Sequence, residues 1–116
     1  MMAAAISVAA ISRKEKKRMS ELFIVVGLKA KTGKENELRR DLSVLVEPSR
    51  NEEGNVRYDL FEDLDEPGHF VFVEEWASVE ARNRHHEHGP HIQHFHANGV
   101  TNVEERMFAH MLKRVV

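Results

Sequence analysis

The segment from Asn55 to Trp76, NVRYDLFEDLDEPGHFVFVEEW, decides the fold of this 116-residue chain. Its first part, Asn55 to Asp63, alternates between apolar and polar residues, and its last part, His69 to Trp76, is rich in β-branched and aromatic residues. Both patterns predict β-strands. The Glu66-Pro67-Gly68 turn joins the two parts, so the sequence predicts a β-hairpin.

A strand and a helix are expected before this hairpin. The stretch from Glu21 to Lys31 (ELFIVVGLKAK) predicts a strand whose middle is apolar on both faces, so each face needs cover. From Gly33 to Ser49 the sequence predicts one helix, which Pro48 is expected to end. The apolar stripe of this helix consists of Leu38, Leu42, Leu45 and Val46.

Helical and strand patterns also follow the hairpin. Ser78 is the expected N-cap of a helix from Val79 to His88, and Gly89-Pro90 separates this helix from a second short one between His91 and about Asn98. The last segment, Val103 to Leu112, fits either a helix or a strand, and we favour the strand.

The expected order is therefore strand, helix, strand, strand, helix, strand. This order is typical of the α+β class, and in particular of a ferredoxin-like split βαβ fold with both helices on one face of a four-stranded antiparallel sheet. The other face stays bare, because the strand at 69–76 has aromatic residues on one side and Val71 and Val73 on the other. A soluble monomer rarely exposes so much apolar surface, so we expect a homodimer.

Composition excludes several classes of function. The length allows one domain, which we place at residues 19–116. A formal net charge of −2 offers no basic surface for nucleic acid. The chain has no cysteine, which excludes disulfides, thiolate catalysis and cysteine-ligated metals and fits a cytoplasmic location.

Residues 1–18 differ from the rest of the chain. An apolar stretch, MMAAAISVAAIS, precedes the basic run RKEKKR. A signal peptide has the opposite order, and a membrane-spanning helix needs about 20 apolar residues, so we expect no membrane partner. The segment is expected to be a disordered or extraneous tail that can be deleted without loss of folding, with an amphipathic targeting or membrane-contacting arm as the alternative.

Two groups of residues near the hairpin could carry chemistry. Tyr58, Glu74 and Trp76 should line one region of the sheet, either as core and interface residues or as a functional site. Glu74 stands out, because a carboxylate among aromatic rings is costly unless it is paired or functional. Ser49-Arg50 with the Glu53-Gly54-Asn55 turn fits either a solvated helix exit or an anchor for a substrate.

A histidine cluster is the third candidate. It contains six of the eight histidines of the chain: His85, His86, His88, His91, His94 and His96. Neutral imidazole is a common metal ligand, but Gly89-Pro90 breaks the helix inside the cluster, and no HExxH motif or supporting carboxylate pattern is present. We therefore expect no metal site, and surface histidines of which one or two face a pocket.

Three segments together carry a family resemblance. They are SRNEEGNVRYDLFED (49–63), FVFVEEW (70–76) and ASVEARNRHHEHGPHIQHF (77–95). In this combination they resemble the antibiotic biosynthesis monooxygenase family, and within it the quinol-monooxygenase-type branch, from about Leu22 to Val116. The resemblance implies a dimeric α+β barrel in which each subunit has a pocket between sheet and helices.

The resemblance also implies an activity, which is the oxidation of a small phenolic, quinol or anthrone-like substrate by O₂ with no metal or other cofactor. The implied catalytic residues are Glu74 with His85 and His91, one of the two histidines acting as the base. The implied substrate-binding residues are Trp76, Phe72, Tyr58 and Arg50. The chain departs from the family pattern at Ile92, where an aromatic residue often follows Pro-His.

Related proteins of this fold leave alternatives open. Haem-degrading members add an asparagine on the first strand, and the segment from Glu21 to Lys31 has none, which argues against haem cleavage. An isomerase of a small, phosphorylated or unphosphorylated metabolite could use the same His and Glu, and a ligand-binding or dimerisation module without catalysis is the third option. An aromatic pocket would favour quinol oxidation, whereas a basic pocket would favour a phosphorylated substrate.

Overall fold

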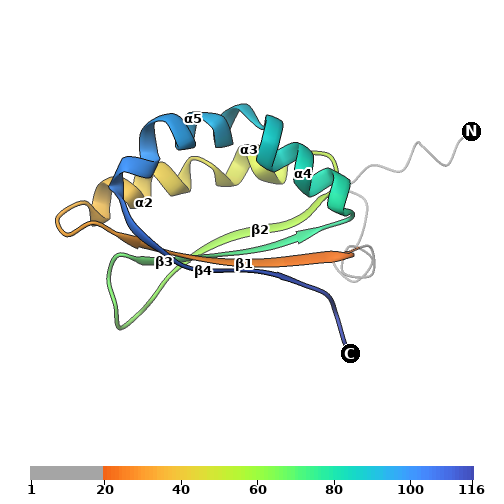
Figure 1. The fold of residues 1–116 in the computed structure, drawn as a ribbon, viewed down its shortest axis with the longest axis horizontal. Coiled ribbons are helices and arrows are strands. Elements are labelled where there is room, and N and C mark those ends of the chain that lie inside the picture. Colours follow the sequence, from red (N-terminus) through yellow and green to blue (C-terminus); the bar gives the residue numbers. More distant parts are fainter. Residues whose placement is uncertain (1–19) are drawn as a thin grey trace, which may run out of the picture.

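A four-stranded antiparallel sheet forms the base of the molecule (Figure 1). The computed structural model describes residues 20–116, and its strands are β1 (Leu22–Ala30), β2 (Asn55–Glu62), β3 (His69–Trp76) and β4 (Val103–Leu112). Their order across the sheet is β2-β3-β1-β4. Because β1 and β3 are the two central strands, both of their faces need apolar residues, as the sequence predicts.

The helices of the described residues lie on one face of this sheet (Figure 1). Between β1 and β2 the chain forms α2 (Glu35–Ser43) and α3 (Val46–Arg50). Between β3 and β4 it forms α4 (Val79–His88), α5 (Pro90–Asn98) and the short 3₁₀ helix η3 (Gly99–Asn102). The expected ferredoxin-like α+β fold is therefore confirmed.

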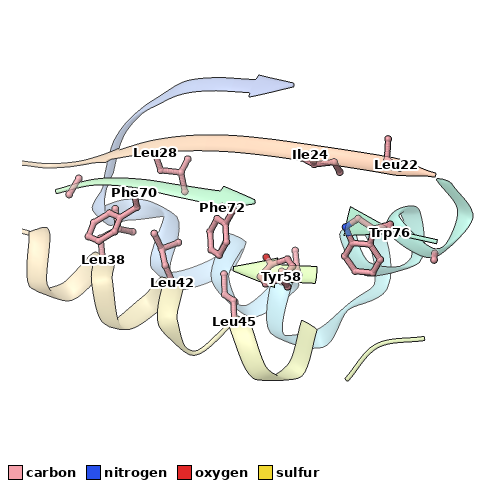
Figure 2. Packing of buried hydrophobic residues seen from close by; sticks show 13 residues of the cluster. Leu22, Ile24, Leu28, Leu38, Leu42, Leu45, Tyr58, Phe70, Phe72 and Trp76 are labelled. Carbon is pink, nitrogen blue, oxygen red and sulfur yellow. The ribbon is translucent and has the colours of Figure 1, made fainter. Parts of the chain in front are cut away.

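The apolar core fills the space between helices and sheet. Figure 2 shows Leu38, Leu42 and Leu45 pointing from the helix layer toward Phe70 and Phe72 of β3. Leu38 and Leu42 have no exposed surface, and Phe70 is 1% exposed. Burial of each such side chain contributes roughly 1.5–3 kcal/mol, so this layer holds the helices in place over the sheet.

The segment predicted as one helix from Gly33 to Ser49 is two helices. α2 ends at Ser43, and a tight turn in which the Leu45 N–H donates to the Leu42 carbonyl (3.1 Å) leads into α3. The prediction that Pro48 ends the helix is wrong, because Pro48 lies inside the first turn of α3. Backbone N–H groups have no intrahelical partner in a first turn, so proline is tolerated there.

The segments after the hairpin follow the prediction. α4 has the predicted bounds, and Ser78 caps it by accepting a hydrogen bond from the Ala81 N–H (3.1 Å). The ambiguous segment Val103–Leu112 is a strand, because it pairs with β1 at the edge of the sheet. Most of its side chains are exposed there, so packing imposes a weaker pattern on β4 than on the central strands.

Within residues 20–116, no helix lies over the other face of the sheet (Figure 1). Phe61 and Leu112 are 48% and 45% exposed, and their pairing partners Val71 and Phe23 are only partly buried. The apolar surface that the sequence predicts on the uncovered face is therefore present.

The tail expected at residues 1–18 lies outside the described residues and stays a prediction. Within residues 20–116, no helix combines the length and the apolar character that crossing a membrane requires.

Candidate active site

Three residues of the hairpin meet beneath the helices. Tyr58 of β2 pairs with Glu74 of β3, and Trp76 lies on the same face of β3. The indole N–H of Trp76 donates to the Glu74 carboxylate (2.9 Å). All three side chains are buried, so the predicted grouping is confirmed, and the indole N–H is the partner that a buried carboxylate needs.

His85 extends this group from the helix layer. It lies in the last turn of α4 and is 5% exposed. Its ring packs against the rings of Trp76 and Tyr58, with centroids 4.8 Å and 5.3 Å away. Its Nδ1 lies 2.5 Å from Oε1 of Glu52, a residue of the loop between α3 and β2. One face of the imidazole is thus fixed by aromatic packing and one nitrogen by a carboxylate.

His91 approaches the same carboxylate from α5. Its Nε2 lies 3.4 Å from Oε1 of Glu52 and 3.0 Å from Oγ of Ser49, which has no exposed surface. The ring centroids of His85 and His91 are 5.6 Å apart. Glu52, Ser49, His85 and His91 therefore form one polar cluster at the junction of three helices, which we call the inner cluster.

The joint between α4 and α5 determines how the two histidines meet. Gly89 is the C-cap of α4 and the N-cap of α5, and Pro90 takes the first position of α5, where its fixed φ favours a helix start. A Cβ at Gly89 would lie 2.6 Å from the His85 carbonyl oxygen, too close for any side chain. The glycine lets the two helices join without a spacer, which brings His85 and His91 together.

Glu52 is held in position by the loop that follows α3. Gly54 has φ of +86°, a conformation that glycine adopts without strain. Its carbonyl accepts a hydrogen bond from the Ala77 N–H (2.8 Å), and a Cβ at Gly54 would lie 2.4 Å from the Ala81 side chain. The loop is therefore fixed against the start of α4, with Glu52 facing the end of the same helix.

Burial governs the charges in this region. It lowers the pKa of His85 to about 3, with smaller contributions from neighbouring basic side chains, His91 first. Burial also raises the pKa of Glu52, an effect that His91 partly offsets. The pKa values of Tyr58 and Glu74 are raised by the same loss of solvent. At neutral pH His85 is thus a neutral imidazole.

A groove of about 300 Å³ opens between α5 and the junction of α2 with α3. Its apolar walls come from Val44, Leu45 and Phe95, and its polar lining from Asp41, His94 and Asn98. His91 lines the groove and also belongs to the inner cluster, so a ligand in the groove can contact its ring. None of the lining residues in the described part of the chain is Lys or Arg.

The inner cluster also has the composition of a metal site. In residues 20–116, Glu52, His85 and His91 each offer one ligand atom, and these atoms all lie within 4.8 Å of one another. Two imidazoles and one carboxylate can hold a first-row transition metal.

Comparison with known proteins identifies the family. The sequence model of the family described as "Antibiotic biosynthesis monooxygenase" matches residues 22–98, which include the whole inner cluster. The chain belongs to the antibiotic biosynthesis monooxygenase family. The matched range runs from β1 to the end of α5, so it contains the hairpin, the glycine joint and most of the groove.

Individual proteins are similar to this chain in sequence or in fold. The chain is 42% identical over 72 residues to "Putative monooxygenase YcnE" of Bacillus subtilis (strain 168), which is 62% of this chain and 75% of that protein. The structure of PA3566 from Pseudomonas aeruginosa is similar with a TM-score of 0.72 and 28% identity, over 84% of this chain and 96% of that one. Rv0793 from Mycobacterium tuberculosis shares the fold, with a TM-score of 0.76 and 24% identity over 84% and 97% of the two chains.

In this member of the antibiotic biosynthesis monooxygenase family, most of the residues proposed from the sequence lie together. The connected set is Glu74, Trp76, Tyr58, Phe72, His85 and His91. The side chain of Arg50 does not contact the side chains of this set. Its guanidinium bonds to the Tyr58 carbonyl (3.0 Å) and to the Asp59 carboxylate (2.9 Å), at the edge of the sheet.

The sequence did not single out Glu52, and it named Ser49 only together with Arg50, as a helix exit or as an anchor for a substrate. Both side chains contact His91, and Glu52 also contacts His85. The available signal was the position of Ser49 and Glu52, three residues apart, at the end of a helix and before a glycine turn. The other histidines of the 85–96 segment, His86, His88, His94 and His96, are exposed, as expected for surface histidines.

Proposed function

We propose that this protein is a monooxygenase that oxidises a small phenolic, quinol or anthrone-like substrate with O₂ and needs no metal or other cofactor for this reaction. The observation that carries the proposal is the position of His91, which lines an apolar groove and also contacts Glu52 and Ser49. Membership of a monooxygenase family supports the reaction type.

The groove supports an aromatic substrate. Its volume of about 300 Å³ is at the lower end of small-molecule sites, which range from roughly 300 to 1,000 Å³. Val44, Leu45 and Phe95 offer apolar contacts to a ring, while Asp41 and Asn98 can bind hydroxyl groups. A phosphorylated substrate would favour Lys or Arg in the lining, and the lining residues include neither.

His91 is the proposed base. In the first step its Nε2 takes the proton of the substrate hydroxyl, or of the acidic CH₂ group of an anthrone, and Glu52 at 3.4 Å stabilises the resulting imidazolium. Ser49 holds the ring by its hydrogen bond to Nε2, and this contact must exchange for the substrate when it binds. His85 is a positioning residue in this scheme, because it touches Glu52 and the aromatic wall instead of the groove.

The oxygen chemistry balances without an external reductant. The substrate carbanion gives its electrons to O₂ and forms a carbon-bound peroxide, which takes back the proton from His91. Loss of water from this peroxide leaves a carbonyl, so R₂CH₂ and O₂ give R₂C=O and H₂O. One oxygen atom enters the product and the other leaves as water, and all four electrons come from the substrate.

The experiment that tests this function is an oxygen-uptake screen of the purified, chelator-treated full chain against quinols and anthrones. We expect O₂ consumption equal to product formed, with ¹⁸O from ¹⁸O₂ in the new carbonyl. Binding of these compounds without O₂ uptake would instead identify a ligand-binding module. Turnover of a phosphorylated or diketone substrate without O₂ would identify an isomerase.

The proposal includes a homodimer that buries the uncovered face of the sheet. Apolar residues of all four strands gather there, among them Phe23, Val71 and Val73, and a free monomer would leave them in water. Sedimentation should give a dimer at micromolar concentration, and Val73→Asp should give a monomer that still folds. A stable wild-type monomer would contradict the barrel.

A cytoplasmic location completes the proposal. A chain without cysteine needs no oxidising compartment to fold, and cell fractionation of the source organism would check this location.

A further inference from the structure

Three side chains from three separate segments direct their ligand atoms to one point. Glu52 comes from the loop before β2, His85 from the last turn of α4 and His91 from the first turn of α5. Both histidines face the same carboxylate oxygen, Oε1 of Glu52. The sequence argument against a metal site was the lack of a carboxylate at a supporting spacing, and Glu52 supplies one from 33 residues before His85.

We propose that Glu52, His85 and His91 form a binding site for one first-row transition metal ion per chain, with Zn²⁺ and Co²⁺ as the best-fitting cations. This proposal goes beyond the oxidation reaction and does not depend on it. A cation on His91 Nε2 blocks the proton transfer proposed there, so the metal-bound chain and the oxidising chain are alternative states. It rests on the number, type and separation of the three donors.

The distances require only a small adjustment. Metal–ligand bonds to imidazole and carboxylate are about 2.0–2.2 Å, so neighbouring ligand atoms in a tetrahedral or octahedral site lie roughly 3.0–3.5 Å apart. The separation of His91 Nε2 from Glu52 Oε1 is already 3.4 Å. His85 Nδ1 is 2.5 Å from the same oxygen, so the carboxylate must retreat by about 1 Å from His85. Glu52 belongs to a loop and its side chain is 24% exposed, which leaves room for this rotation.

The donor set selects the class of metal. Mg²⁺ and Ca²⁺ prefer sites built from oxygen ligands, whereas two imidazole nitrogens and one carboxylate suit Zn²⁺, Co²⁺, Ni²⁺ or Fe²⁺. A site with three protein ligands keeps one position open for water or a ligand. Ser49 Oγ, 3.0 Å from His91 Nε2, is placed to hydrogen-bond a water in that position.

The exposed histidines provide the competing explanation for metal binding. His86 and His96 form a pair with ring centroids 5.8 Å apart, on the outer surface of α4 and α5. Two imidazoles without a carboxylate bind the same cations more weakly, so this pair would give an adventitious site. The test must therefore separate the two groups of histidines.

Co²⁺ titration of the chelator-treated full chain is the experiment, because the visible absorption of Co²⁺ reports nitrogen and oxygen ligation without any substrate. We expect one Co²⁺ per chain, displaced by Zn²⁺. Glu52→Gln and His91→Ala should each weaken Co²⁺ binding by at least about 100-fold, since even loss of groups that only orient ligands weakens sites by 10–100-fold. His86→Ala combined with His96→Ala should leave the affinity unchanged.

Three results would overturn the metal site. They are wild-type affinity in both Glu52→Gln and His91→Ala, loss of binding in the His86 and His96 double variant, and no Co²⁺ binding by the wild type. His91 is partly exposed, so its truncation should leave the chain folded even if Glu52→Gln does not, and melting curves check this point. The Co²⁺ titration contains no substrate, so its failure would not change the result of the oxygen-uptake screen. A failure of the oxygen-uptake screen would likewise not change the Co²⁺ result.

Discussion

The segment from His85 to His96 contains two kinds of histidine that the sequence alone does not distinguish. His85 and His91 lie on the sides of α4 and α5 that face the loop of Glu52, and they are buried or partly buried. The other four are exposed, and His94 among them lines the groove. The comparison shows that the contact of His85 and His91 with one carboxylate follows from the joint at Gly89 and the position of Glu52, and not from the density of histidines.

The inner pair also differs from the outer histidines in electrostatics. Burial keeps His85 neutral by lowering its pKa to about 3. His86 on the same helix is exposed, and its pKa is lowered by partial burial and by nearby Arg82, while the Glu87 carboxylate partly opposes this shift. These two histidines of α4 thus have lowered pKa values, but His85 is buried against Glu52, whereas His86 is exposed.

The largest effect is expected from the wall behind His85. Trp76→Ala should lower the free energy of unfolding by roughly 3–5 kcal/mol, because it removes a fully buried aromatic ring and leaves a cavity. The matched change in the outer group, His96→Ala, should change it by less than about 0.5 kcal/mol. Urea unfolding measures both free energies of unfolding. Equal losses in the two variants would mean that Trp76, which packs against His85, contributes no more to stability than an exposed histidine.

Activity should divide the histidines in the same way. His91→Ala and His91→Gln should lower kcat by about 100-fold or more, because neither side chain can take a proton from the substrate. His88→Ala, in the exposed group, should leave kcat within a factor of about two. Steady-state O₂ uptake gives both values. A wild-type kcat in His91→Gln would show that His91 is not the base.

Ser49 sharpens the comparison because it acts through an inner histidine. Ser49→Ala should lower kcat by about 10-fold, since His91 loses the hydrogen bond that orients its ring. In the His91→Ala background the same change should have no further effect on kcat. This double-mutant cycle separates positioning from general destabilisation, which would add to the loss instead.

The smallest effect concerns the buried charge under the inner cluster. Burial raises the pKa of Glu74 above its usual value, although the Trp76 N–H opposes the shift. At pH values between the unfolded-state and the folded-state pKa of Glu74, the folded chain therefore binds more protons than the unfolded chain. Stability should therefore fall as pH rises from the unfolded-state pKa through the folded-state pKa. Glu74→Gln should reduce this fall, because only the contribution of Glu52, whose pKa is also raised, then remains, and the variant should be at least as stable as wild type near pH 7. Melting temperatures from pH 4 to pH 8 test this, and an unchanged slope would contradict it.

Much of the fold was predictable because its signals are local. β3 and α4 have the predicted bounds, since alternation on a central strand and a serine N-cap are short-range patterns. The break between α2 and α3 was not, because both sides of it keep the same apolar stripe. Pro48 misled for a related reason, since proline favours a helix start as well as a helix end.

The site was predictable only on the regular elements. Glu74 and Trp76 follow from strand alternation, and His85 from the helix before Gly89. Glu52 lies in a loop, where no periodicity indicates which way a side chain points. Its role depends on a contact 33 residues away that only the folded chain defines. Arg50 shows the opposite case, because a cation near a site in sequence is paired with Asp59 in the structure.

The shared cap at Gly89 makes the number of residues between His85 and His91 a property of the site. Each residue inserted at the joint would turn α5 by about 100° relative to α4, and each deletion would turn it back by as much. His91 would then leave the groove while every side chain kept its identity. In an insertion scan, we expect insertions between His85 and His91 to abolish activity as often as insertions in the central strands, although this segment is polar and lies at the protein surface. Relatives should therefore vary in what lies between these two histidines, but not in how many residues separate them.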